Sequence, residues 1–197
     1  FSLSKYLLKK KFTVLGIDSL NNYYNLKLKK KRIKLLKSKK FHFIKIDISQ
    51  RTKFFKEINK KKFDHIIHLS AQPGVRYSLL KPESYITNNI VAFSNILDLT
   101  KQRKLDLIYA SSSSVYGDSK KFPIKEDFAL KAQNIYALTK IQNEQQAELY
   151  SKLYKLRIIG LRFFTVFGEW GRPDMFLIKF FEFARMKKIF PLFNSGN

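Results

Sequence analysis

Short apolar runs rich in β-branched and aromatic residues alternate with longer amphipathic stretches along most of the chain. The runs are typical of buried parallel strands, and the stretches repeat their apolar residues at helical spacing. Strands are predicted at 12–18, 41–47, 63–69, 105–110, 156–164 and 189–193, and helices at 1–11, 25–37, 51–60, 82–103, 175–187 and in a long segment after Asn134. This alternation predicts an α/β fold built on a doubly wound, Rossmann-like parallel sheet.

Two of the predicted helices carry an apolar stripe that should face the core. In the helix at 82–103 the stripe is Ile86, Ile90, Phe93 and Leu97. In the helix after Asn134, a residue well placed to cap it, the stripe is Leu138, Ile141, Leu149 and Leu153. Both helices are therefore predicted to pack on the sheet through these side chains.

Polar residues gather where the predicted strands end, and ligands of such sheets bind beyond the carboxyl ends of the strands. The residues at these ends are Asp18, Asp47, Ser70, Ala71, the turn 72–76 that includes Arg76, and the four serines 111–114. Serine hydroxyls can hydrogen-bond a polar substrate. The serine run is therefore a candidate substrate site.

Asp18 closes the first predicted strand, as does the acid that binds the adenosine ribose in dinucleotide-binding units. In such units a glycine-rich turn lies ~20 residues before the acid. Counting back from Asp18 places that turn ahead of Phe1. We therefore expect a truncated chain that lacks the first strand and the glycine-rich loop. The alternative for Asp18 alone is an ordinary acid at a strand end.

Tyr136 and Lys140 are four residues apart and so share one face of the predicted helix. A free phenol titrates near pH ~10, but a neighbouring cation favours the phenolate and moves proton abstraction toward neutral pH. The pair is therefore a candidate base with its activator, although the same spacing occurs by chance in many helices.

The composition of the 197 residues, of which 45% are hydrophobic, is that of a globular protein. The sequence has no cysteine, which excludes disulfides and thiolate metal sites, and its three histidines lack the spacing of a zinc motif. It contains no apolar run of the ~18 residues that span a bilayer. We expect a cytoplasmic protein with no metal and no membrane contact.

A net charge of +24 invites a nucleic-acid interpretation, because cations neutralise phosphates. The lysines cluster at the ends of predicted helices and in connecting turns. Solvated surface is the favoured interpretation, so no nucleic-acid partner is expected. A non-catalytic basic binding module remains the alternative from another functional class.

Four segments together resemble the extended short-chain dehydrogenase/reductase family. They are HLSAQPGVRYSL (68–79), YASSSSVYG (109–117), YALTK (136–140) and GLRFFTVFGEWGRPDM (160–175). Within that family they are most similar to the NAD-dependent nucleotide-sugar epimerases, and to the UDP-glucuronate 4-epimerases in particular. The similarity covers nearly the whole chain, and four blocks in order are far more specific than any one of them.

The resemblance assigns roles to individual residues. It makes Tyr136 the catalytic base, Lys140 its activator and the ligand of the nicotinamide ribose, and Ser112 the catalytic hydroxyl. For NAD it implies Tyr136 and Lys140 as cofactor-binding residues, Asp18 at the adenosine ribose, and Asp47 with Ile48 at the adenine. It also implies Leu69, Ala71 and Asn89 along the cofactor channel, and Phe163, Phe164 and Val166 near the nicotinamide. For the UDP-sugar it implies Arg76, Ser112, Ser113, Ser114, Thr165 and Arg172. Arg172 would pair with a glucuronate carboxylate.

The implied reaction converts UDP-glucuronate to UDP-galacturonate through a transient 4-keto sugar, with tightly bound NAD and a homodimeric enzyme. Related dehydratases and decarboxylases carry carboxylates where this chain has Ser113 and Ser114. A hydroxyl cannot replace a carboxylate as a general base at neutral pH, so epimerisation is favoured over those two alternatives. Another nucleotide-sugar epimerase also remains an alternative.

The domain expectation is one incomplete NAD-binding domain over 1–197, in which 165–197 begins the substrate-binding part. Most of the smaller C-terminal substrate domain is expected to be missing. Glycine-rich loops supply the amides that bind the pyrophosphate, and none occurs in the printed sequence. An inactive fragment is therefore a further alternative for the chain by itself.

Overall fold

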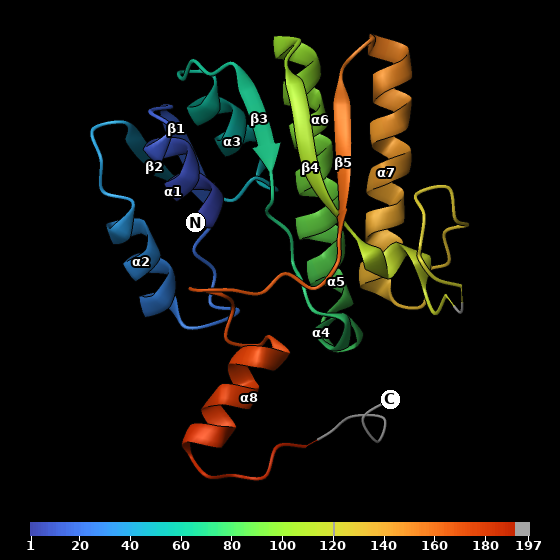
Figure 1. The fold of residues 1–197 in the computed structure, drawn as a ribbon. Helices are drawn as coiled ribbons and strands as arrows, with labels where there is room; N and C mark the ends of the chain where they lie inside the picture. Colours follow the sequence, from blue (N-terminus) through green and yellow to red (C-terminus); the bar gives the residue numbers. More distant parts are fainter. Residues whose placement is uncertain (120, 192–197) are drawn as a thin grey trace. The chain divides into compact units, whose positions relative to one another are not determined.

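The computed structural model describes residues 1–119 and 121–191 and consists of parallel strands and helices (Figure 1). Its strands are β1 (Val14–Asp18), β2 (Phe41–Lys45), β3 (His65–His68), β4 (Asp106–Ser112) and β5 (Ile158–Phe163). They form a two-stranded sheet of β1 and β2 and a three-stranded sheet in the order β3-β4-β5. The predicted α/β class, with parallel strands in each sheet, is confirmed.

Helices separate most of the strands along the chain. They are α1 (Ser2–Lys9), α2 (Leu26–Leu35), α3 (Arg51–Ile58), α4 (Val75–Leu80), α5 (Pro82–Tyr85), a π-helical turn η1 (Ile86–Val91), α6 (Ala92–Arg103), a 3₁₀ turn η2 (Ser113–Tyr116), α7 (Ile135–Tyr154) and α8 (Phe176–Arg185). Asn134 caps α7 as predicted, because its side-chain oxygen accepts a hydrogen bond of 2.9 Å from the Ala137 amide. This cap fixes where the first turn of α7, with Tyr136, begins.

The chain divides into two compact units, which are described separately below. Unit 1 comprises residues 1–16, 20–43 and those from Thr165 onward, and unit 2 comprises 17–19 and 44–164. Unit 2 holds the three-stranded sheet and most of the predicted site residues. Unit 1 holds Thr165, Val166 and Arg172.

In the three-stranded sheet, β4 lies between two parallel neighbours. His65 of β3 is opposite Asp106, and Ser112 at the other end of β4 is opposite Phe163 of β5. The sheet packs on α6 and α7 (Figure 1), and the fully buried Phe93 of α6 contacts Tyr109 of β4 with ring centroids 4.9 Å apart. The carboxyl ends of β3, β4 and β5 therefore lie at one edge of the sheet.

Hydrogen bonds at both ends of β1 show that it runs parallel to β2. The Val14 amide donates to the Lys40 carbonyl at 2.8 Å, and the Ile46 amide donates to the Asp18 carbonyl at 3.1 Å. Asp18 is the exposed last residue of β1. The prediction of an acid at a carboxyl strand end is confirmed here.

The predicted helix 82–103 is interrupted, and its predicted buried stripe is partly wrong. The π-helical turn separates α5 from α6, and Ile86 is 49% exposed, whereas the neighbouring Tyr85 is fully buried. Tyr85 takes the inward position because its hydroxyl donates to the carbonyls of Pro73 at 2.8 Å and Gly74 at 2.5 Å. The spacing of apolar residues cannot predict the inward position of Tyr85, because its hydrogen-bond partners are distant in sequence.

The predicted apolar stripe of α7 is also wrong. Leu138, Leu149 and Leu153 are exposed, and the buried face instead carries Ala137, Thr139, Lys140, Asn143 and Ala147. Small residues let the helix approach its neighbours closely, and two of the polar ones have partners outside the helix, Asn89 for Thr139 and the Ala110 carbonyl for Lys140. The exposed leucines do not pack in the core and could contact a partner molecule.

Three boundaries also differ from prediction. β4 continues through Ser111 and Ser112, which pair with Arg162 and Phe163 of β5, so serine does not end the strand. The expected turn at 72–76 ends in α4, which begins at Val75. Residues 189–191 of the strand expected at 189–193 form none, and 192 and 193 lie outside the described residues.

Over residues 1–119 and 121–191, no helix is both long and apolar enough to cross a membrane. Within the same ranges, no three histidine, cysteine or acidic side chains come together in a group that could hold a metal ion.

Candidate active site

Tyr136 and Lys140 lie in the first two turns of α7, where the helix meets the end of β4. Lys140 is only 2% exposed, and its Nζ donates a hydrogen bond of 2.8 Å to the Ala110 carbonyl. The same Nζ lies 5.9 Å from the centre of the Tyr136 ring. The structure thus brings the phenol and the ammonium together as the spacing predicts.

Burial lowers the pKa of Lys140 to about 8, and the nearby Glu144 carboxylate acts in the opposite direction. The ammonium is therefore still charged at neutral pH. His68 of β3 is also buried, and burial together with the Lys140 charge lowers its pKa to about 3. Of these two groups, Lys140 therefore carries the positive charge at neutral pH and the His68 imidazole is neutral.

The serine run turns from β4 into η2 directly beside this pair along the chain. Ser112 is buried, and its hydroxyl accepts from the Ser114 amide at 3.2 Å and contacts the Ser114 hydroxyl at 3.2 Å. Ser113 and Ser114 are half-buried in the 3₁₀ turn. The hydroxyls predicted for substrate binding therefore lie at the carboxyl end of β4, in a turn held by its own hydrogen bonds.

Glu144 and Arg162 form a polar cluster that the sequence analysis missed. Arg162 of β5 binds the Glu144 carboxylate through two hydrogen bonds, Nε to Oε1 at 3.0 Å and Nη2 to Oε2 at 2.9 Å. Ser111 donates to the same Oε1 at 2.5 Å. Glu144 could have been found from the sequence, because it follows Lys140 by four residues and so lies on the same face of α7. Arg162, eighteen residues later, had no local signal.

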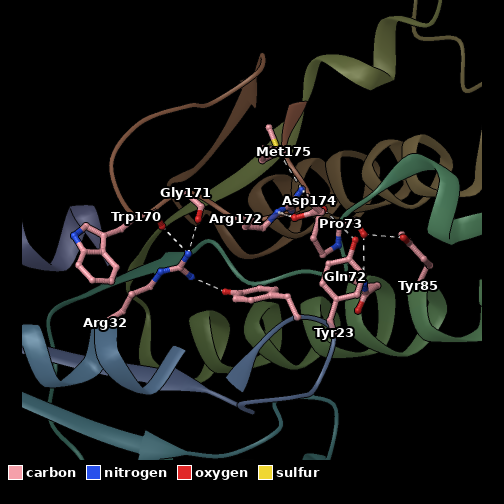
Figure 2. A network of polar contacts seen from close by, with 11 residues as sticks. Tyr23, Arg32, Gln72, Pro73, Tyr85, Trp170, Gly171, Arg172, Asp174 and Met175 are labelled. Carbon is pink, nitrogen blue, oxygen red and sulfur yellow. Dashed lines mark hydrogen bonds and ion pairs between the residues drawn. The ribbon is translucent and has the colours of Figure 1, made fainter. Parts of the chain in front are cut away.

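The loop after β3 carries the predicted cofactor residues Leu69 and Ala71, and Asn89 fixes its path. The Asn89 side chain accepts from the Gln72 amide at 2.7 Å and donates to the Gln72 carbonyl at 3.2 Å and the Thr139 hydroxyl at 3.1 Å. Tyr85 binds the next residue of the loop, Pro73 (Figure 2). Asn89 thus joins the loop to α7, one residue before Lys140.

The other predicted cofactor and substrate residues of unit 2 lie at strand ends or just after them, apart from Arg76. Asp47 follows β2 and accepts from the amide and the hydroxyl of Ser49, at 2.9 and 2.7 Å. The Ile48 carbonyl accepts from Asn95 of α6 at 2.8 Å. Phe163 closes β5 with an exposed side chain, and Arg76 is an exposed residue of α4.

In unit 1, the loop from Thr165 to Asp174 carries the remaining predicted residues. Thr165 and Val166 are exposed. Arg172 binds Asp174 through two hydrogen bonds of 3.0 and 3.1 Å, and Tyr23 donates to the same carboxylate at 3.2 Å (Figure 2). Farther along the loop, Arg32 donates to the carbonyls of Trp170 and Gly171, at 2.6 and 2.8 Å. The loop is therefore anchored by α2 and by the segment before it.

The donor set fits a nicotinamide dinucleotide at the positions that the chain contains. The buried ammonium of Lys140 and the phenol of Tyr136 suit a ribose and a reacting hydroxyl, and the exposed carboxylate of Asp18 suits a second ribose. The glycine-rich turn that would bind the pyrophosphate is not in the printed sequence.

Comparisons with known proteins agree with this chemistry. The NAD dependent epimerase/dehydratase family matches residues 2–197. Protein CapI of Staphylococcus aureus is 42% identical over 99% of the chain and 59% of its own length. UDP-glucuronate 4-epimerase 1 of Arabidopsis thaliana is 41% identical over 87% of the chain and 40% of its own length.

Among solved structures, the UDP-glucuronic acid 4-epimerase of Bacillus cereus, in complex with UDP-glucuronic acid and NAD, has a TM-score of 0.89 and 33% identity, covering 99% of the chain and 62% of that protein. The chain thus spans 59% of the length of the Staphylococcus relative and 62% of this one. The resemblance drawn from the four sequence segments is confirmed, and the chain belongs to the NAD dependent epimerase/dehydratase family.

Proposed function

We propose that the protein containing this chain is a UDP-glucuronate 4-epimerase that interconverts UDP-glucuronate and UDP-galacturonate in the cytoplasm. The observation that carries the proposal is the charged, buried Lys140 beside Tyr136 at the end of β4, next to the serine run. The names of the Arabidopsis and Bacillus relatives support the choice of sugar. The family supports the use of NAD as the cofactor.

In this proposal Tyr136 removes the proton from the sugar 4-hydroxyl and later returns one to the 4-keto oxygen. The Lys140 cation favours the phenolate form that accepts the proton. Ser112 hydrogen-bonds the same sugar oxygen and helps to orient it. When bound, NAD supplies the redox step by accepting a hydride from C4 and returning it to the other face of the sugar.

The residues proposed to hold NAD are those that the resemblance assigns. Lys140 binds the nicotinamide ribose and Asp18 the adenosine ribose, while Asp47 and Ile48 border the adenine. Leu69, Ala71, Asn89, Phe163 and Val166 line the remaining channel. Asn89 acts chiefly on the loop after β3, because all three of its observed hydrogen bonds are internal.

The sugar nucleotide is proposed to bind Arg76, Ser112, Ser113, Ser114, Thr165 and Arg172. Arg172 is the candidate ligand of the uronate carboxylate, because guanidinium groups bind carboxylates in pairs of hydrogen bonds. Its existing pair with Asp174 holds the guanidinium in a defined orientation. Residues from Thr165 onward begin the substrate-binding part in this proposal.

We also propose that the protein is a homodimer through α7. The exposed Leu138, Leu149 and Leu153 form part of an apolar surface on the helix that carries Tyr136. Burial of apolar surface between two copies would stabilise the pair by ~25 cal/mol for each square ångström removed from water. The family resemblance likewise implies dimerisation through this helix.

The proposal is tested by incubating the longest native form of the protein with NAD and UDP-glucuronate, with products separated by ion-exchange chromatography. We expect UDP-galacturonate from the wild type and a loss of turnover of at least ~100-fold in Tyr136→Phe. Tyr150→Phe is the matched control, because Tyr150 lies on the same helix with its hydroxyl bound to Asp98 at 2.9 Å.

Wild-type activity retained by Tyr136→Phe would show that another group is the base. Formation of UDP-xylose, or turnover of UDP-glucose in preference to UDP-glucuronate, would replace the proposed reaction by decarboxylation or by another epimerisation.

A further inference from the structure

Two successive residues of β4 bind two successive turns of α7. The Ala110 carbonyl accepts from Lys140 Nζ at 2.8 Å, and the Ser111 hydroxyl donates to Glu144 Oε1 at 2.5 Å. Residues four apart on a helix lie one above the other on the same face. Two such attachments fix both the rotation of α7 about its axis and its position along the strand, which a single hydrogen bond cannot do.

Glu144 is also held by Arg162 of β5. The two hydrogen bonds of this ion pair, 3.0 and 2.9 Å, join both carboxylate oxygens to the guanidinium. The side chains are 15% and 21% exposed, so the pair is shielded from water more than a surface ion pair is. Arg162 and Ser111 are also direct partners in the β4–β5 register. The carboxylate therefore joins the two strands to the helix.

Arg162 extends the cluster to the segment after the serine run. Its Nη1 donates to the Tyr116 hydroxyl at 2.9 Å and to the Glu126 carbonyl at 2.7 Å. The bond to Glu144 raises the pKa of Arg162, which stays charged throughout the accessible pH range. Tyr116 closes η2, the turn that contains Ser113 and Ser114. The cluster thus binds Ser111, the first residue of the serine run, and Tyr116, two residues beyond its last.

The charge of Glu144 also acts on Lys140. Burial disfavours the ammonium, and the Glu144 carboxylate, one helical turn away, favours it. The other groups near Lys140 are His68 from β3, which is neutral at physiological pH, Tyr136 from α7 and the Ala110 carbonyl from β4. Glu144 is the anion identified near the ammonium, and Arg162 binds its carboxylate.

We propose that Glu144 is a positioning residue for the Tyr136–Lys140 pair. Through Ser111 and Arg162 it fixes α7 on the sheet, and through its charge it keeps Lys140 protonated beside the phenol. This inference rests on the proposed function for its catalytic meaning, but the geometry and the charge effect are tested without turnover.

The test follows the titration of Lys140 by NMR, in the longest native form of the protein labelled with ¹³C at the lysine Cε. Lys140→Arg identifies the signal. We expect the Lys140 midpoint to fall by at least ~0.5 pH unit in Glu144→Gln, because an adjacent negative charge is lost while the amide can still accept from Ser111. Glu148→Gln is the matched control on α7, one turn farther on and paired with Lys152 at the surface, and should leave the midpoint unchanged.

Arg162→Gln provides a second variant with an expected effect of opposite sign. Removal of the guanidinium leaves the Glu144 charge uncompensated, so the Lys140 midpoint should rise. A shift of the same sign in both variants, or no shift in Glu144→Gln, would overturn the charge role. If Glu144→Gln does not fold, the rise in Arg162→Gln decides the same question.

A pH profile of epimerisation tests the catalytic meaning. In Glu144→Gln we expect the alkaline limb of kcat to move down in pH together with the Lys140 midpoint. A uniform loss of kcat at every pH would indicate a merely structural role and would overturn the inference. No UDP-glucuronate turnover in the wild type would reject the proposed function, whereas the NMR titration would still decide whether Glu144 controls Lys140.

Discussion

Arg172 and Asp174 form a two-fold hydrogen-bonded ion pair within one loop, with distances of 3.0 Å from Nε to Oδ1 and 3.1 Å from Nη2 to Oδ2. The candidate ligand of the sugar carboxylate therefore already has a carboxylate partner from its own chain. A substrate carboxylate that approaches Arg172 experiences the Asp174 charge as well. Under the proposed function, selectivity for an acidic sugar would then depend on both residues.

We predict that Asp174→Asn increases the preference for UDP-glucuronate over UDP-glucose by ~2- to 5-fold, the size expected for a partly exposed charge pair of up to ~1 kcal/mol. Arg172→Gln should remove the preference. Dissociation constants from calorimetry with NAD present provide the measurement. An equal loss of affinity for both sugars in Asp174→Asn would mean that the pair matters only for the shape of the loop.

We predict that the free energy of unfolding falls at acidic pH because His68 is buried in its neutral form. Its folded pKa of about 3 lies below the ordinary value of 6.5, so the unfolded state binds more protons between these values. The corresponding stabilisation is present above pH 6.5 and is lost as the pH falls toward 3, with an upper limit of ~5 kcal/mol. As the pH is lowered over this range, the free energy of unfolding in urea should therefore fall less for His68→Gln than for the wild type. His65→Gln, an exposed histidine of the same strand, is the control, and identical losses in both variants would contradict the prediction.

Asn89→Ala should destabilise the protein by ~3 kcal/mol, because it leaves the amide and carbonyl of the buried Gln72 without their Asn89 partner and removes the hydrogen bond that the Thr139 hydroxyl accepts. Asn88→Ala is the matched control, since Asn88 binds Ser84, which is four residues earlier in the chain, and not the loop after β3 or α7 among the described residues. Equilibrium unfolding in urea measures both. Equal costs for the two variants would argue against Asn89 as the link between the loop after β3 and α7.

Gly160→Ala should cost ~1 to 3 kcal/mol through steric overlap. A Cβ at Gly160 would lie 2.5 Å from the Tyr109 hydroxyl oxygen and 2.6 Å from the adjacent ring carbon, and these residues are opposite one another in β4 and β5. Tyr109→Leu should relieve part of this cost, so the double variant should be less destabilised than the sum of the single variants. Additive costs in thermal unfolding would refute the overlap.

Leu149→Glu combined with Leu153→Glu should dissociate the proposed dimer, because two charges would be buried at an apolar contact. Analytical ultracentrifugation of the longest native form of the protein measures the change. Gln102→Glu, at an exposed position of α6 and therefore outside the leucine face of α7, is the control and should remain dimeric. A monomeric wild type, or an unchanged dimer in the double leucine variant, would place the contact elsewhere or remove it.

Local sequence patterns were enough to predict the alternation of strands and helices. Apolar runs predicted β1 to β5 within a few residues, and Asn134 predicted the start of α7. The Tyr136–Lys140 pair was also predictable, because residues four apart share a helix face whatever lies around the helix. Four short motifs were enough to indicate the family, which the comparisons confirm.

Only the tertiary structure showed which face of α7 is buried and what holds Lys140. The leucines of α7 carry the stronger apolar pattern, yet Lys140 and Asn143 are buried, since the Ala110 carbonyl offers a partner to Lys140 and the small Ala137 and Ala147 permit close packing. Tyr85 and Glu144 likewise depend on partners far along the chain, Pro73 with Gly74 for the first and Ser111 with Arg162 for the second. Periodicity depends on neighbours in sequence, whereas the burial of a polar group depends on a hydrogen-bond partner that only folding brings near.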